Sequence, residues 1–216
     1  MAFTGWPVEA IEFYEGLEAD NTKTYWTEHK ATYEECVKAP MEELLADLQR
    51  SFGEGKIFRP YRDVRFSKDK TPYKTNIAAT MEKGGYISLD ADHFSVGTGY
   101  YLMARDQLAR FRAAIVDDTV GATLDETVNR LRGKGLEVTA HDTLTTAPRG
   151  FDKDHPRIEL LRMKGCIAWQ QWEIDAWVGT AEPKERVRSF LKTAKPLVDW
   201  LDAEVGPTEL EDERRR

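Results

Sequence analysis

The sequence predicts an α+β protein in which an antiparallel meander of about five to six strands packs against N-terminal and C-terminal helices. Apolar residues recur every three or four positions at both ends of the chain, which is typical of helices with one buried face. Between residues 56 and 103 the period falls to about two, and β-branched and aromatic residues become more frequent. Short glycine and aspartate turns link these strand segments, which favours hairpins over crossovers.

The first fifty residues predict three helices. The first helix begins near Pro7 and ends at Asp20, the second is capped by Thr22, and the third has Pro40 in its first turn and stops at Gly53. Each has one apolar stripe. The expected buried positions are Ala10, Phe13, Tyr14, Leu17, Trp26, His29, Tyr33, Val37, Met41, Leu44, Leu45, Leu48 and Phe52.

The middle of the chain predicts most of the strands. Four candidates follow one another in the sequence, at residues 57–67, 76–82, 86–89 and 93–103. The turns between the last three are residues 83–85 and 90–92. Two further strands are expected at residues 136–139 and 166–174.

Helices return after the meander. We expect them at residues 106–116, 123–132 and 158–163, followed by a long final helix with an apolar face over residues 187–201. Pro196 predicts a kink or a restart in that helix. No repeat or linker interrupts the chain, so we expect a single domain over residues 1–208 and a frayed, charged tail over 209–216.

Composition restricts the classes of function. The 216 residues carry a formal net charge of −7, which disfavours nonspecific binding of nucleic acid without excluding it. No apolar stretch approaches the length of a membrane span and the N-terminus lacks the pattern of a secretory signal, so we expect a cytoplasmic protein with no membrane partner. Cys36 and Cys166 are expected to be buried thiols, without a disulfide framework or metal-binding hairpin.

One stretch of the chain is strongly basic, and we call residues 58–76 the basic segment. From Lys56 to Lys74 there are seven Lys or Arg against two Asp, a local net charge of +5. If residues 58–67 are extended, Arg59 and Arg65 share a face with Asp63 between them. This pattern fits a structural ion-pair ladder. It equally fits a site where Asp63 orients guanidinium groups toward a ligand carboxylate or phosphate.

We predict that the basic segment contributes to a binding site for a phosphorylated or carboxylate small molecule. If the site is catalytic, Asp63 or His155 would transfer protons, and no cofactor or metal is expected. The candidate ligand-binding residues are Arg59, Arg62, Asp63, Arg65, Ser67, Lys68, Lys70, Tyr73, Lys74, Asn76 and His155. The alternative is a noncatalytic module that binds nucleic acid or protein through the same residues. A third interpretation is a folding element in which Arg62 and Asp63 lock a strand to a helix.

Other combinations of residues point more weakly to function. Gly97 and Gly99 lack the third glycine of a dinucleotide fingerprint, and fit a close backbone approach within a strand. Neither Ser67 nor Cys166 lies in a recognisable nucleophile motif. Trp169, Trp172 and Trp177 fit either a stacking platform or the core and its rim. Asp152, Asp154 and His155, with His141 and Asp142 nearby, fit either metal ligands or a turn that precedes a helix.

Several of these motifs occur together in one known family. The stretch RDVRFSKDKTPYKTN, residues 62–76, resembles the hallmark of a widespread uncharacterised family of bacterial and fungal proteins, a domain of unknown function. The resemblance extends to Asn21, Trp26, Lys30 and Tyr33, to Gly97-Thr98-Gly99-Tyr100, and to Pro148-Arg149-Gly150-Phe151-Asp152 with His155-Pro156. It covers nearly the whole chain up to the last helix. It implies one domain but no particular reaction, so whether the chain is an enzyme stays open.

Overall fold

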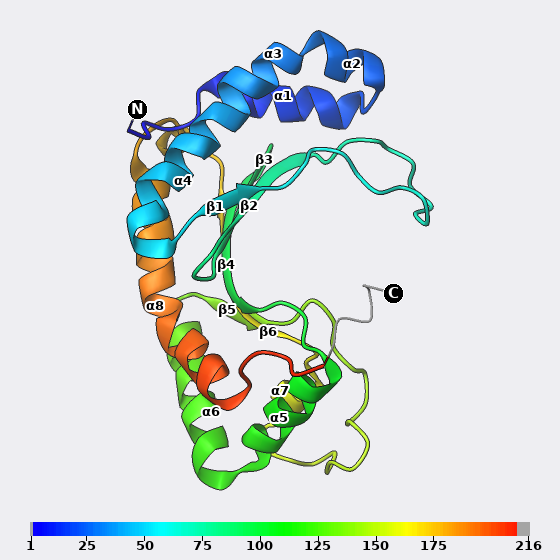
Figure 1. The fold of residues 1–216 in the computed structure, drawn as a ribbon, viewed down its shortest axis with the longest axis vertical. Helices are drawn as coiled ribbons and strands as arrows, with labels where there is room; N and C mark the ends of the chain where they lie inside the picture. Colours follow the sequence, from blue (N-terminus) through cyan, green and yellow to red (C-terminus); the bar gives the residue numbers. More distant parts are fainter. Residues whose placement is uncertain (1, 211–216) are drawn as a thin grey trace. The chain divides into compact units, whose positions relative to one another are not determined.

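The computed structural model describes residues 2–210 and confirms the predicted α+β class (Figure 1). Six strands form an antiparallel sheet in the order β1-β2-β3-β4-β6-β5. The strands are β1 Gly55–Ile57, β2 Asn76–Met81, β3 Tyr86–Asp90, β4 His93–Tyr100, β5 Glu137–Thr139 and β6 Cys166–Glu173. The helices are α1 Val8–Ala19, α2 Lys23–Glu28, α3 Lys30–Thr32, η1 Tyr33–Lys38, α4 Ala39–Phe52, α5 Arg105–Val116, α6 Asp118–Gly133, α7 Ile158–Arg162, η2 Ala176–Gly179 and α8 Glu182–Glu204.

The chain divides into two compact units, which we describe separately. The first contains Met1–Val96 and Gln171–Phe190, and the second contains Gly97–Gln170 and Leu191–Arg216. The single domain over residues 1–208 stays a prediction. Of the tail predicted over residues 209–216, only the first two residues are described, and 211–216 lie outside the described part. In the two described residues of this tail, the backbone N–H of Glu209 donates to Asp106 Oδ2 at 2.8 Å.

In the first unit, the N-terminal helices form where the apolar stripes predicted them. Thr22 accepts a hydrogen bond from the backbone N–H of Tyr25 at 3.2 Å and so caps α2, as expected. Pro40 lies in the first turn of α4, but the preceding chain is also helical, through the π-helical turn η1. Pro40 has no backbone N–H and cannot donate to a carbonyl of the preceding turn. The π-helical turn η1 lies at the place where this hydrogen bond is missing.

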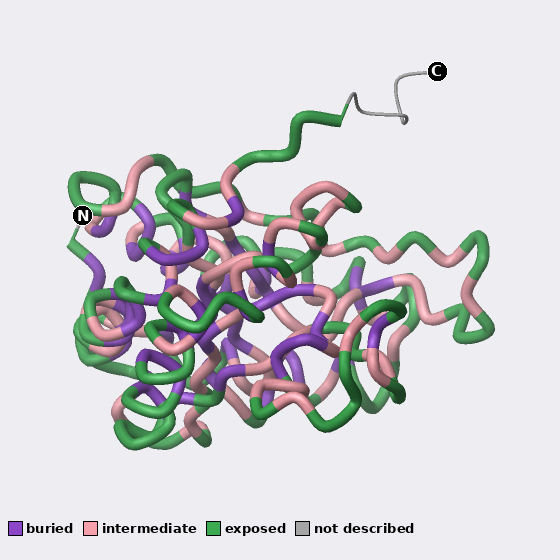
Figure 2. Tube along the Cα trace, turned by 90° about the horizontal axis from the view of Figure 1, so that it is seen from below, coloured by how far each residue is buried: buried purple, intermediate pink, exposed green. Residues whose placement is uncertain are grey.

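The predicted strand at residues 57–67 is wrong beyond its first residue. β1 ends at Ile57, and residues 58–75 extend away from the sheet before returning to β2 (Figure 1). One isolated bridge, between Tyr61 and Tyr73, pairs the outgoing and returning chain. Only Tyr73 among these residues is buried, and the tube in Figure 2 is exposed or half-buried over the rest of this excursion. Pro60 and Pro72 have no N–H to donate, which limits further pairing.

In the second unit, two predicted boundaries change by three residues or more. α6 begins at Asp118, before the predicted residue 123, because the Asp117 carboxylate accepts the N–H groups of Thr119 and Val120 at 2.9 and 2.8 Å. β4 ends at Tyr100, before the predicted residue 103.

Two further features concern single elements. α8 is one helix that contains Pro196, so the predicted restart is absent. No helix within residues 2–210 is both long enough and apolar enough to cross a membrane.

The glycines of the Gly97-Thr98-Gly99-Tyr100 motif permit the close approach that the sequence predicts. Gly99 has φ 119°, and a Cβ there would lie 2.4 Å from the carbonyl oxygen of Cys166. A Cβ on Gly97 would lie 2.8 Å from a ring carbon of Trp169. Both positions therefore need glycine for steric reasons within the second unit.

Candidate functional site

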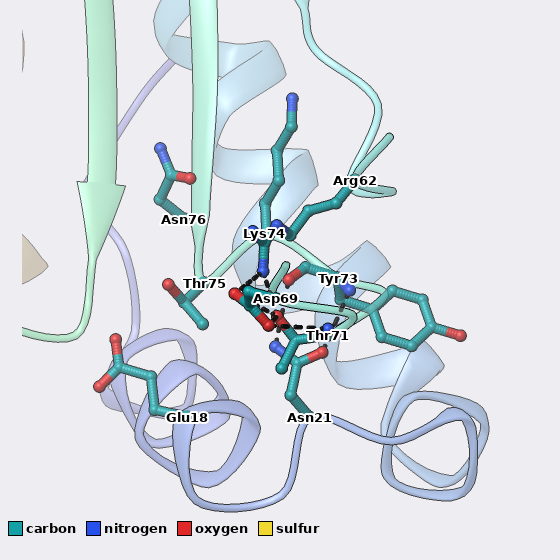
Figure 3. A pocket seen from close by; sticks show the side chains of 9 residues that line it. All are labelled: Glu18, Asn21, Arg62, Asp69, Thr71, Tyr73, Lys74, Thr75 and Asn76. Carbon is teal, nitrogen blue, oxygen red and sulfur yellow. Dashed lines mark hydrogen bonds and ion pairs between the residues drawn. The ribbon is translucent and has the colours of Figure 1, made fainter. Parts of the chain in front are cut away.

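A pocket of about 440 Å³ lies where the basic segment returns to the sheet, within the first unit (Figure 3). Its volume is within the range of small-molecule sites. It is formed by the end of α1 and the turn after it, by the basic segment and by the start of β2. The lining residues are Glu18, Asn21, Arg62, Asp69, Thr71, Tyr73, Lys74, Thr75 and Asn76.

Asn21 attaches the returning chain to the N-terminal helices. Its amide Nδ2 donates to the backbone carbonyl of Tyr73 at 3.1 Å, and its Oδ1 accepts the backbone N–H of Tyr73 at 3.1 Å. The Asn21 amide thus satisfies both backbone hydrogen-bonding groups of Tyr73, as the backbone of a neighbouring strand would. The Tyr73 ring stacks on Trp26, with centroids 4.4 Å apart and planes 6° apart. Asn21 and Trp26 therefore make the attachment to the helices that the third interpretation gave to Arg62 and Asp63.

Arg62 is neutralised inside the pocket. Its Nη1 contacts Asp69 Oδ2 and Thr71 Oγ1, as Figure 3 shows. Asp69 Oδ1 also accepts the backbone N–H of Thr71 at 2.9 Å, which closes a tight turn. The Thr71 N–H and the Arg62 guanidinium hold the pKa of Asp69 down at about 2. The carboxylate stays charged at neutral pH, so Arg62 already has a resident anion.

Asp63 and Arg65 form a second internal pair. Arg65 Nε and Nη2 donate to the two oxygens of Asp63 at 2.9 and 2.7 Å. This bidentate contact holds the pKa of Asp63 at about 2. The Arg65 side chain is 76% exposed, and neither residue lines the pocket. The pair is an exposed local contact, separate from the pocket.

The outer part of the basic segment is also tied to itself. Lys70 Nζ donates to the backbone carbonyl of Val64 at 2.9 Å, and that carbonyl also accepts the N–H of Ser67 at 3.3 Å. Lys68 is exposed and has no polar partner among residues 2–210. Ser67, Lys68 and Lys70 were predicted site residues, and none of them lines the pocket.

Lys74 differs from the other lysines because it is half-buried and lacks a carboxylate partner within the described residues. Its Nζ lies 5.3 Å from the centroid of the Phe58 ring. Burial, and then the charge of Arg59, lower the pKa of Lys74. In Figure 3 the side chains of Lys74 and Asn76 extend on the side away from Glu18, and Thr75 between them points the other way. Successive side chains of an extended backbone point to opposite sides, which explains this arrangement.

The extended chain from Lys74 to Asn76, which we call the strip, has a different charge on each of its two faces. On the Thr75 side, Glu18 is the nearby acid, and burial followed by the charges of Asp92 and Asp90 raises its pKa. On the Lys74 side, Asn76 Nδ2 donates to Ser88 Oγ at 2.7 Å, which fixes the orientation of its amide. The Lys74 side therefore carries the positive charge, and the Thr75 side faces the acid.

His155 belongs to the second unit and does not line the pocket. Its Nδ1 accepts the backbone N–H of Arg157 at 3.0 Å, and Asp152 Oδ1 accepts the N–H of Asp154 at 2.9 Å. These contacts match the predicted turn before a helix. Within the part of the chain that the structure describes, the residues that cluster with metal-ligand spacing are instead Asp90, Asp92 and His93, whose ligand atoms lie within 4.8 Å of one another.

The three tryptophans, for which the sequence allowed either a stacking platform or the core and its rim, pack against other residues of the chain. The Arg186 guanidinium lies 3.9 Å from the centroid of Trp177 and 5.3 Å from that of Trp172. A cation of the chain thus already occupies these rings. Trp169 lies against Gly97.

Sequence reasoning missed five lining residues: Glu18, Asn21, Asp69, Thr71 and Thr75. Asp69 and Thr71 had a usable signal, because an Asp two residues before a Thr often accepts its N–H in a turn. Glu18 had no such signal. It looks like any solvated carboxylate on the polar face of a helix.

Comparison with known proteins gives a family. A family model described as conserved hypothetical protein (DUF2461) matches residues 9–200. The chain belongs to this family. No curated protein matches it. The description of the DUF2461 family names no reaction.

Among solved structures, a conserved hypothetical protein from Pyrococcus furiosus matches this DUF2461 chain at 12% identity and a TM-score of 0.35. The match covers 74% of this chain and 90% of the other. A TM-score of 0.35 is too low to support an inference about fold or function.

Proposed function

We propose that this chain binds a small anionic ligand, a phosphorylated or carboxylate compound, through Lys74, Arg59 and the amide of Asn76. The observation that carries the proposal is the half-buried side chain of Lys74, whose ammonium group forms no ion pair with a carboxylate within residues 2–210 and feels the charge of the exposed Arg59. Desolvated charges in proteins are normally paired. An anion bound at Lys74 would supply the missing partner, and the charge of Arg59 would add to the attraction.

The proposed site is narrower than the one expected from the sequence. Arg62 and Arg65 each have an internal carboxylate, and the Lys70 ammonium has a backbone carbonyl. These contacts support a role for them in shaping the basic segment. Lys74 and Asn76 share one face of the strip that runs into β2, and a ligand there would meet an ammonium and an amide held by Ser88.

Thermal unfolding in the presence of inorganic phosphate, a sugar phosphate and citrate tests the proposal. We expect at least one of them to raise the melting temperature of the wild-type chain, since a ligand that binds only the folded state stabilises it. Lys74→Met should abolish the shift while keeping a side chain of similar length over Phe58. Lys68→Met is the matched control, because Lys68 is exposed and lies outside the pocket. Equal shifts in wild type and Lys74→Met would refute the proposal.

A noncatalytic role in binding nucleic acid or protein remains the second candidate, and one observation favours it. Phe66 is 95% exposed, next to Arg65 and close in sequence to Lys68. An aromatic side chain between cations is typical of surfaces that stack on unpaired bases. Retention of the chain on single-stranded RNA that weakens with salt and is lost in Phe66→Ser would support this role. Absence of retention at low salt would remove its nucleic-acid form.

A further inference from the structure

The second unit contains a separate pocket that the proposed function does not use. It has a volume of about 370 Å³ and is lined by Arg105, Leu108, Ala109, Arg112 and Phe151. The first four residues belong to α5 at positions i, i+3, i+4 and i+7, so they share one face of the helix. Seven residues of helix place the two arginines about 10 Å apart along its axis. The apolar residues Leu108 and Ala109 thus lie between the two arginines along this face of the helix.

Arg112 has an incomplete set of partners. Its Nε donates to the backbone carbonyl of Leu161 at 3.2 Å, which anchors the guanidinium at the pocket. No carboxylate among residues 2–210 pairs with it, and burial is the influence that lowers its pKa. With Nε occupied, the two terminal nitrogens remain as the forked donor pair that binds carboxylates. A partly desolvated cation without an anion favours an external one.

Phe151 supplies the opposite wall and connects the pocket to the Pro148-Arg149-Gly150-Phe151-Asp152 stretch. Pro148 is buried, and its carbonyl accepts the N–H of Phe151 at 3.1 Å. This turn places the half-buried Phe151 at the pocket that the α5 face lines. The family-like motif therefore has a place in the structure that the first pocket does not explain.

We infer that this pocket binds a small apolar carboxylate, an aromatic or branched aliphatic acid whose carboxylate pairs with Arg112 and whose hydrocarbon part packs on Leu108, Ala109 and Phe151. A monoanionic, planar carboxylate suits one guanidinium fork. The apolar walls disfavour a phosphate, because its larger charge would lose more hydration there. Arg105, exposed at the first turn of α5, adds positive charge at the mouth of the pocket.

Calorimetric titration of the full chain with phenylacetate and 4-methylpentanoate tests this inference, with 2-phenylethanol as the neutral analogue. At least one acid should bind saturably, and the alcohol should bind roughly tenfold or more weakly, since it lacks the charged hydrogen bonds. Arg112→Gln should weaken the acid by a similar factor. Arg130→Gln, an exposed arginine of α6, is the matched control and should leave binding unchanged.

A second variant separates loss of binding from loss of folding, because Arg112→Gln also removes the contact with Leu161. Ala109 is exposed, so Ala109→Trp should fold, fill the pocket and abolish binding while both arginines remain. Lys74→Met should bind the acids normally, which distinguishes binding at this pocket from binding at the site proposed around Lys74. The inference is overturned if neither acid binds, if the alcohol binds equally well, or if Ala109→Trp binds like wild type.

Discussion

The most direct test of the architecture is to remove the amide that attaches the basic segment to the helices. Asn21→Ala deletes both hydrogen bonds to the Tyr73 backbone, each 3.1 Å long. Tyr73 is only 6% exposed, so its N–H and carbonyl do not readily regain water. At about 0.5–1.5 kcal/mol for each hydrogen bond, the variant should lose about 1–3 kcal/mol of unfolding free energy. For a chain of this size a loss near 2 kcal/mol corresponds to roughly 4–8 °C in melting temperature.

Urea unfolding followed by circular dichroism measures this loss, and Asn129→Ala is the matched control. Asn129 is exposed on α6, so the same substitution there should change stability by about 0.5 kcal/mol or less. Limited trypsin digestion reports local release, because Lys68 and Lys70 lie in the excursion that Asn21 helps to anchor. Faster cleavage there is expected in Asn21→Ala. Equal stability and equal cleavage in the two variants would refute the anchoring role.

Two further predictions concern charge and close packing. Asp69 has its pKa lowered from 3.8 to about 2, so its stabilising contribution is complete above about pH 4 and is lost as the pH falls toward 2. The free-energy gap between wild type and Asp69→Asn should therefore shrink over that interval in urea titrations, and a gap independent of pH would contradict the assignment. Gly99→Ala should cost more than about 2 kcal/mol because its Cβ would meet the Cys166 carbonyl oxygen at 2.4 Å. Gly133→Ala, with nothing within 4 Å of its Cβ, should be neutral or stabilising, and similar losses for both would disprove the steric explanation.

The helices and most strands could be predicted because their signals are local. Apolar spacing identified α1 and α4, and the Thr22 cap appears where its residue type predicts it. The excursion after Ile57 could not be predicted in the same way. Alternating residues show that a backbone can be extended, but they do not show whether a partner strand is available.

The site was predicted less completely than the fold because its contacts join distant parts of the chain. Asn21 and Tyr73 are 52 positions apart, and nothing local to either residue indicates that they meet. The positive charges and the pairing of Asp63 with a neighbouring arginine were visible in the sequence, but the neutralisation of Arg62 by Asp69 was not. Arg62 reaches Asp69 only because the chain reverses between them, and that reversal depends on the turn that Thr71 closes.

The partly dehydrated environment of Lys74 has a chemical consequence beyond anion binding. A lowered pKa means that a larger fraction of this side chain is the neutral amine at a given pH, and the neutral amine is the form that attacks electrophiles. We therefore expect an acylating or aldehyde reagent to react with the Lys74 amine as well as with exposed lysines. The burial that leaves the charge without an ion-pair partner also favours the form of the side chain that can be labelled covalently.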